Sequence, residues 1–469
     1  MYLLYAVIAA LSVYAWRNWF VSLCGLIVLS AAMGHPDMPR TMFGIPGLNP
    51  WNVALALVAL PWLTQRSQQG LRFDFPRPVK GLLVAYLLIV FVSYLRAVLD
   101  LDSFPSRLHH SGVERYTLLG VTFDYLINPV KYMIPGLMVF DGARTRQRVL
   151  IALCATLAMS VVYSWLVVRT IPLHSLEVNE KAQMRQRHRI GKRVGFHANS
   201  VAMACVAGCW GIVATCRLRR RWTHYALVCG LAALVAVAIM MTRSRAGYVA
   251  FAGVGLVLGV LLWRKLLILL PALAAVICVA FPGVPERLAM GFGVQEVSGE
   301  QTVDMNTVTA SRMTVIWPAA IAEIVKSPLI GYGRVGILRN RAYDTMLEYT
   351  PTPPTHPHNA YLELLMDTGI VGTALVLSFF GALLWISARL CRQKHDPLLQ
   401  AIGAASLAAV LAIMIMGLSG ASFFPRENGQ MAWCLFGLAS RAAAATRPRR
   451  APASVEFLRA AYGGRRAPA

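Results

Sequence analysis

The chain has 469 residues, of which 57% are hydrophobic and only 14% are charged. A soluble globular domain contains about 25% charged residues, so this composition excludes an ordinary soluble protein. Lysine and arginine number 45 against 21 aspartates and glutamates, a formal net charge of +24 that favours an anionic partner.

Long apolar segments recur along the whole chain. A helix needs about 20 apolar residues to cross the hydrocarbon core of a bilayer, and continuous rather than alternating segments favour helices over a barrel. We therefore predict an all-α polytopic membrane protein with about 12 or 13 transmembrane helices, the first three being short enough to leave the count open. The predicted spans are residues 2–16, 19–33, 51–64, 81–99, 123–141, 149–170, 198–216, 225–241, 249–263, 266–281, 368–388, 401–420 and 431–445.

Short basic loops predict the orientation of these spans. The loops that are rich in arginine and lysine and almost free of acids are 66–80, 143–148, 217–222, 263–265 and 389–394. The positive-inside rule makes them cytoplasmic. The opposite side then carries 100–122, 171–197, the turn 242–248 and a large loop, 282–359, between late helices. Within that loop, residues 308–328 predict an amphipathic helix that ends at Ser327-Pro328.

This threading divides the chain into five parts. They are N-terminal membrane helices (1–190), membrane helices with arginine-bearing outer turns (191–281), the large outer loop (282–359), C-terminal membrane helices (360–445) and a basic cytoplasmic tail (446–469).

Four segments with polar side chains are expected on the outer side. They are "KRVGFHANSVA" with Arg193, His197 and Asn199, "MMTRSRAGYVAF" with Arg243 and Arg245, "SRMTVIWPAAIAEIVKSPLIGYG" with Arg312, Gly331 and Gly333, and "HNAYLELLMDTGIVG" with His358 and Asn359. Guanidinium groups bind phosphate oxygens in a bidentate manner, and helix N-termini also attract anions. Histidine titrates near neutral pH and is suited to act as a base.

Each of these residues also has an ordinary structural interpretation. Arg193 is either an anion ligand or a solvated loop charge, because long loops cross the membrane regardless of charge. Arg243 and Arg245 either bind substrate or anchor the headgroup region. Arg312 either binds substrate or pairs with Glu323 or another acid in its loop.

The fourth segment leaves similar alternatives open. Asn359 is either a ligand group or a helix N-cap, and His358 either acts on substrate or packs its loop. Glu363 and Asp367 lie four residues apart on one helical face, where they can pair with the arginines of the other segments. A helix that begins at residue 360 is too long for the bilayer alone, and we expect it to bend or break near Gly369.

Taken as an ordered set, these segments resemble the O-antigen ligase and polymerase superfamily of bacterial envelopes. The residues that carry the resemblance are "TRSRAGY", the R…W…SP-x-x-G-x-G pattern, and His358-Asn359 followed by Gly369-x-x-Gly372. The first spans and the arginine-rich segment 180–193 are similar to the glycosylation ligases linked to exosortase systems. The segment "GFHANSVA" departs from the usual family pattern, because Ala198 stands where a proline is expected.

The resemblance implies an inner-membrane ligase with its active site on the periplasmic side. It would transfer a glycan from a polyprenyl diphosphate to a hydroxyl of a lipid or protein, without a metal, a cofactor or nucleic acid. His358, Arg245 and Arg193 would then be catalytic, with substrate bound by Arg312, Arg243, Asn199, Asn359, Gly331 and Gly333. Alternative functions are a polysaccharide polymerase of the same superfamily and a transporter or flippase of the lipid-linked glycan.

Two other patterns have ordinary explanations. The G-x-G-x-x-G pattern at 331–336 lacks the strand and βαβ context of a dinucleotide site. Asp100-x-Asp102 is either a metal site or a solvated or capping pair.

Overall fold

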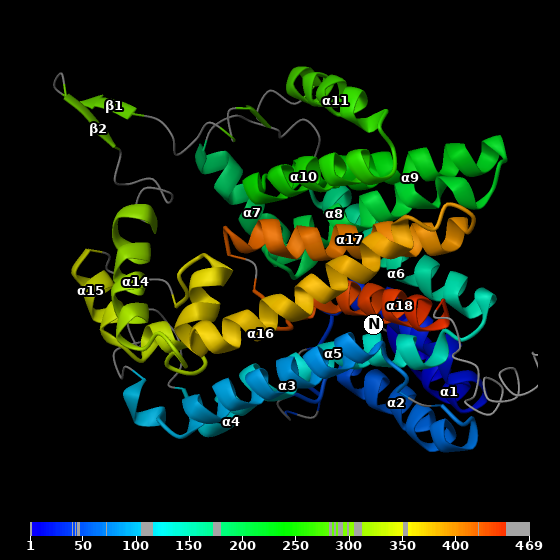
Figure 1. Cartoon of the computed structure of the whole chain (residues 1–469), viewed down its shortest axis with the longest axis horizontal. Coiled ribbons are helices and arrows are strands. Elements are labelled where there is room, and N and C mark those ends of the chain that lie inside the picture. The colour runs from blue at the N-terminus through cyan, green and yellow to red at the C-terminus, as the bar shows by residue number, and fades with distance from the viewer. Residues whose placement is uncertain are drawn as a thin grey trace, which may run out of the picture.

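The computed structural model shows a bundle of long helices lying side by side (Figure 1). The residues that it describes are 2–446 except 40, 43, 45–46, 72, 105–115, 172–179, 281–283, 286–287, 289–293, 298–299, 304–311, 350–354 and 421. The predicted tail therefore lies almost wholly outside the described residues.

The bundle is built from apolar helices. They are α1 (Tyr2–Leu29), α2 (Pro50–Gln68), α3 (Arg77–Val98), α5 (Asn128–Gly142), α6 (Arg146–Thr170), α8 (Ala198–Ala214), α9 (Trp222–Met241), α10 (Arg245–Leu261), α11 (Leu266–Ala280), α16 (Ala360–Cys391), α17 (Pro397–Gly417) and α18 (Gln430–Ala445).

Shorter elements lie between these helices. They are α4 (Leu118–Thr122), α7 (Glu180–Val194), α14 (Trp317–Lys326), α15 (Arg341–Tyr349), the π-helical turns η4 (Phe123–Ile127) and η7 (Arg312–Ile316), the 3-10 turns η1 (Ser30–Ala32), η2 (Leu101–Ser103), η6 (Thr215–Leu218), η8 (Gly336–Leu338) and η9 (Glu427–Gly429), and the strands β1 (Val294–Val297) and β2 (Glu300–Val303). The strands form one antiparallel hairpin in the large loop. The predicted amphipathic helix is confirmed as η7 and α14, which end at Lys326 before the Ser327-Pro328 stop.

The all-α polytopic class is confirmed. Seven described helices are long and apolar enough to cross a membrane, in α1, α3, α6, α8, α9, α16 and α17, and α10 and α11 are shorter apolar helices. Helices α2, α5 and α18 occupy three further predicted spans. The predicted spans 2–16 and 19–33 fall in the single element α1, whose backbone leaves the helical region at Asn18 with φ −153° and ψ 83°.

The centre of the bundle is formed by helices rich in small residues. Most of the residues of α8 and α17 are buried, and these two helices pack against each other. Alanine and glycine side chains let membrane helices approach closely, so that packing replaces the hydrophobic drive that lipid does not supply. Helix α17 also packs on α10 and α16, and α16 packs on α3.

Several of the basic loops that were predicted to share one side meet at one end of the bundle. Asp141 accepts a hydrogen bond from Arg66 at 2.7 Å, and Arg441 donates to Asp74 at 2.9 Å. At the same end, Arg146 at the start of α6 pairs with Asp396, which caps α17. These contacts join segments far apart in the sequence, as the threading requires.

The large loop lies at the other end of the bundle. Elements α14 and α15 gather beside the N-terminal part of α16 and the end of α3, at the left of Figure 1. Arg96 on α3 donates to the carbonyl of Gly331 at 2.7 Å. This contact fastens the loop to the bundle and positions the polar segments described next.

Candidate functional site

Polar residues from the four predicted segments converge at this end of the bundle. His358 lies close enough to Arg312 and to His197 for their charges to lower its pKa. Arg312 in turn lies close enough to Arg245 for the charge of Arg245 to lower the pKa of Arg312. Each of these residues lies at the start of a helical element. Arg312 is the first residue of η7 and Arg245 the first residue of α10. His197 is the N-cap of α8, and His358 directly precedes Asn359, the N-cap of α16. The structure therefore brings the four predicted segments together at one end of the bundle.

Side-chain hydrogen bonds join the turn between α9 and α10 to helix α7. Arg243 has a left-handed backbone with φ 52° and is 2% exposed, and its Nε donates to Gln186 at 3.4 Å. Arg187 donates to the Arg243 carbonyl at 2.9 Å and to Asn199 Oδ1 at 3.0 Å. Ser244 donates to the same Asn199 oxygen at 2.8 Å. Arg243 and Asn199 thus hold the scaffold of the turn, and Arg245 follows as the first residue of α10.

Arg193 lies on a different face of α7 from Arg187, which makes two of these hydrogen bonds. Gln186, Ile190 and Val194 form its buried face at helical spacing, whereas Arg193 is exposed. Arg187 is the arginine of this helix that reaches Asn199. Because the buried residues repeat every four positions, a helical projection of 180–194 would have separated these two arginines.

Arg312 is a partly buried cation, and its Nε, which is shielded from solvent, has no hydrogen-bond partner among the described residues. The predicted alternative of an ion pair with Glu323 is wrong, because Glu323 accepts hydrogen bonds from Lys326 and from the Tyr332 hydroxyl. Burial, and then the charge of Arg245, lower the pKa of Arg312 below its ordinary value. An anion bound here would relieve both effects.

Two histidines precede α16 in close contact. The ring centroids of His356 and His358 lie 4.2 Å apart, and the carbonyl of Pro357 between them accepts a hydrogen bond from Trp317 Nε1 at 3.0 Å. Asn359 caps the helix, since its Oδ1 accepts from the backbone N–H of Tyr361 at 3.0 Å. The N-cap alternative for Asn359 is therefore the one that the structure shows.

Both imidazoles are held in the neutral form at neutral pH. The pKa of His358 is lowered to about 3, chiefly by burial and then by the neighbouring charges of His356, Arg312 and His197. The pKa of His356 is also lowered, chiefly by burial, with the Glu363 carboxylate acting in the opposite direction. A neutral ring has a lone pair to accept a proton and an N–H to donate.

Helix α16 breaks at the predicted place. Gly369 has φ 63°, and the segment 328–333 runs beside the break. Tyr332 N–H donates to the Met366 carbonyl at 2.8 Å, and Gly333 N–H donates to the Asp367 carbonyl at 2.8 Å. Gly331 and Gly333 thus lie at a backbone junction, which explains why the chain needs glycine there.

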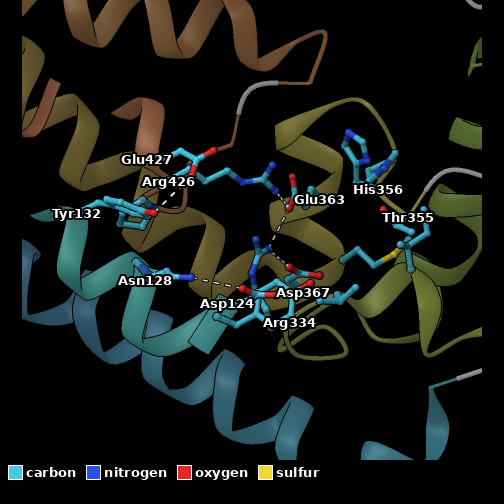
Figure 2. A pocket seen from close by; sticks show the side chains of 17 residues that line it. Asp124, Asn128, Tyr132, Arg334, Thr355, His356, Glu363, Asp367, Arg426 and Glu427 are labelled. Carbon is cyan, nitrogen blue, oxygen red and sulfur yellow. Dashed lines mark hydrogen bonds and ion pairs between the residues drawn. The ribbon is translucent and has the colours of Figure 1, made fainter. Parts of the chain in front are cut away.

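A cavity of about 380 Å³ opens beside the first turns of α16 (Figure 2). Its lining residues are Asp124, Tyr125, Asn128, Pro129, Tyr132, Arg334, Val335, Ile337, Thr355, His356, Pro357, Glu363, Met366, Asp367, Pro425, Arg426 and Glu427. Four of them are carboxylates and two are arginines, so hydrogen-bonding groups surround the space. His358 is not part of this lining.

A buried ion pair forms the floor of the cavity. Arg334, which is 4% exposed, donates to Glu363 at 3.0 Å and also to Asp367, whose other oxygen accepts the Gly336 N–H at 2.9 Å. Arg426 reaches Glu363 at 3.4 Å. Glu363 and Asp367 do pair with arginine, but the partners found are Arg334 and Arg426, which were not among the arginines that the sequence analysis singled out. Because Arg334 lies inside a glycine-rich turn, no periodicity in the sequence would have identified it.

Asp100, one of the two aspartates considered for a metal, pairs with Arg339. In the part of the chain that the structure describes, no three histidines, cysteines or acids are grouped closely enough to hold a metal ion.

The fold and this site define a multi-pass helical membrane protein in which arginines and neutral histidines converge at one end. Residues 230–377 match the model of the family described as O-Antigen ligase, and this match supports a place in the O-antigen ligase superfamily. The resemblance inferred from the motifs is thereby confirmed. The matched region contains Arg245, Arg312 and His358, whereas Arg193 and Asn199 precede it. No curated protein matches the chain at a significant level.

This match supports a glycan-processing function of the O-antigen ligase or polymerase kind.

Proposed function

We propose that the chain is a glycan ligase of the bacterial inner membrane, with its active site on the periplasmic side. It transfers a glycan from a polyprenyl diphosphate to a hydroxyl group of a lipid or protein. The observation that carries this proposal is the position of Arg312: among the described residues its Nε has no partner, and it lies within electrostatic range of Arg245 and of His358.

The arrangement suits the chemistry of such a transfer. Arg245 and Arg312 hold the diphosphate and stabilise the charge that develops on it as the leaving group. Arg193, on the exposed face of α7, attracts the anionic donor toward the site. The pair His356–His358 supplies a neutral imidazole that accepts the proton of the acceptor hydroxyl.

Binding of a simple probe tests the anion site. Farnesyl diphosphate is a short polyprenyl diphosphate, and its affinity for the detergent-solubilised full chain can be measured by thermal shift. R312A should weaken binding about 10-fold to 100-fold, because a charge-assisted hydrogen bond contributes about 1.5–3 kcal/mol. R312K should recover part of the affinity, since lysine keeps the charge but not the planar fork. Unchanged binding by R312A would remove the site.

Product analysis tests the reaction. Purified protein in detergent is incubated with radiolabelled lipid-linked glycan from the source bacterium and with its membranes. A ligase moves one preformed glycan to a new carrier, a polymerase lengthens the chain on the lipid diphosphate, and a transporter produces no transfer without two compartments. Label that stays on the original carrier at its original length would contradict the proposal.

A further inference from the structure

The two histidines before α16 have different surroundings. His356 belongs to the lining of the 380 Å³ cavity, where Figure 2 shows it at the edge above Glu363. His358 lies outside that lining, within range of the charges of Arg312 and His197. His356 therefore faces an open space and His358 does not, although both lie within range of the charge of Arg312.

The intervening chain fixes this division. Pro357 is buried, and its carbonyl accepts a hydrogen bond from Trp317. His358 has a left-handed backbone with φ 53° directly before Asn359, the N-cap of α16. Proline restricts its own φ, and a left-handed residue reverses the direction of the chain locally. The two rings are thus held in one relation, 4.2 Å apart, and they cannot exchange places without breaking these contacts.

The charged groups around the two histidines also differ. Among the charged groups near His356, Glu363 has the largest effect and favours an imidazolium, whereas Arg426, Arg312 and Arg334 oppose it. Near His358, the effects of His356, Arg312 and His197 all oppose a positive charge, and that of Glu363 is smaller. A proton is therefore better tolerated on the ring that faces the cavity.

We propose that His356, rather than His358, takes the proton from the acceptor, that the cavity admits a hydroxyl-rich acceptor such as a glycan, and that His358 donates its N–H to the donor diphosphate. This inference rests on the proposed ligase function. The cavity suits such an acceptor because carboxylates, Asn128, Tyr132 and Arg426 offer hydrogen bonds to hydroxyl groups. The low pKa of His358, about 3, agrees with a donor role, because a base that weak accepts little proton at neutral pH.

The step balances without a further reactant. The acceptor oxygen forms a bond to the anomeric carbon while the bond from that carbon to the diphosphate oxygen breaks. The bonding electron pair leaves with the diphosphate, whose charge Arg245 and Arg312 hold. The acceptor proton passes to a ring nitrogen of His356, is stabilised there by Glu363, and is released to water after the product leaves.

A matched pair of substitutions in the full-length protein tests this division. H356Q keeps a polar side chain of similar reach but no base, and it should lower glycan transfer by about 100-fold or more while farnesyl diphosphate binds as in the wild type. Added imidazole should restore part of the transfer in H356A, which a merely structural histidine would not allow. H358A should weaken farnesyl diphosphate binding by about tenfold, and H358Q should recover part of it through its amide N–H.

The outcomes are separable. Transfer by H356Q at the wild-type rate would overturn the inference, and so would H358A with normal probe binding but no transfer. Loss of probe binding by H356Q, in a variant that still unfolds at the wild-type temperature, would overturn it as well. Absence of any transfer by the wild-type protein would instead contradict the ligase function on which the inference rests.

Discussion

Gly331 lies directly against the break of α16 at Gly369. A Cβ atom on Gly331 would stand 2.4 Å from the Met366 carbonyl oxygen, and one on Gly369 would stand 2.3 Å from the Leu329 carbonyl carbon. Both residues have positive φ, 61° and 63°. The loop and the helix therefore meet backbone to backbone, and this junction places Arg334 over the first turns of α16.

We expect G331A and G369A to destabilise the protein. A left-handed backbone costs a residue other than glycine about 1–2 kcal/mol, and the backbone clash adds to this. The measurement is the thermal unfolding temperature of each variant in detergent. Gly381 is the control, since it lies in the same helix and a Cβ atom added there would meet no atom within 4 Å. G381A should be neutral or stabilising by about 0.5–1 kcal/mol, because alanine favours helix. Equal unfolding temperatures for all three variants would contradict the close junction.

The buried ion pair at Arg334 leads to a second prediction. R334A leaves Glu363 and Asp367 buried without their main partner, and removal of one member of a buried pair costs about 3–5 kcal/mol. R146A is the control, because Arg146 pairs with Asp396 at the exposed end of the bundle with 66% of its side chain accessible. Its loss should cost no more than about 1 kcal/mol. A similar fall in unfolding temperature for both variants would show that the Arg334 pair is solvated.

Much of this architecture could be predicted from the sequence because membrane helices are specified by composition. The apolar segments and the break at Gly369 depend on local residue chemistry, and the structure has helices over the predicted apolar segments and a break at Gly369. The convergence of Arg245, Arg312 and His358 followed from counting crossings, which needs no knowledge of how the helices pack.

The details of the site depend on packing, and there the sequence was insufficient. The exposed Arg193 and the inward Arg187 differ only in their position on α7, whose helical form was not predicted. Arg334 gained its carboxylate partners through the Gly331–Gly369 junction, a long-range contact that no local pattern encodes. The sequence also does not show which of the two rings, His356 or His358, faces a cavity.

The hydrogen bonds of Arg187 to the turn between α9 and α10 lead to a third prediction. R187A removes hydrogen bonds to the Arg243 carbonyl and to Asn199, so the turn that presents Arg245 should become less ordered. Farnesyl diphosphate binding should weaken about tenfold, given about 1.5 kcal/mol for a bond from a charged donor. R193A, which removes an exposed charge from the same helix, should weaken it far less, and only at low salt. A larger effect from R193A than from R187A would restore Arg193 as a direct ligand.

The orientation of the bundle can be tested by cysteine labelling. Tyr349, at the end of α15, is 66% exposed, and Arg220 lies in an exposed basic loop at the opposite end. A membrane-impermeant maleimide should label Y349C in intact spheroplasts and R220C only after the membrane is opened. The background variant replaces the exposed cysteines, Cys154, Cys229 and Cys278, with alanine. Labelling of R220C alone in intact cells would invert the proposed topology.

The half-buried His358 predicts how stability depends on pH. Its pKa is about 3 in the folded protein, against an ordinary value near 6.5 in the unfolded chain. Between these values the unfolded state binds more protons, so the free energy of unfolding should rise with pH and fall as the solution is acidified from about 6.5 toward 3. H358Q does not titrate, and its unfolding temperature should fall less steeply over this window. H395Q is the control, since His395 directly follows the basic loop 389–394 at the other end of the bundle. Parallel curves for wild type and H358Q would show that the imidazole is solvated, and they would remove the physical basis for separating the roles of the two histidines.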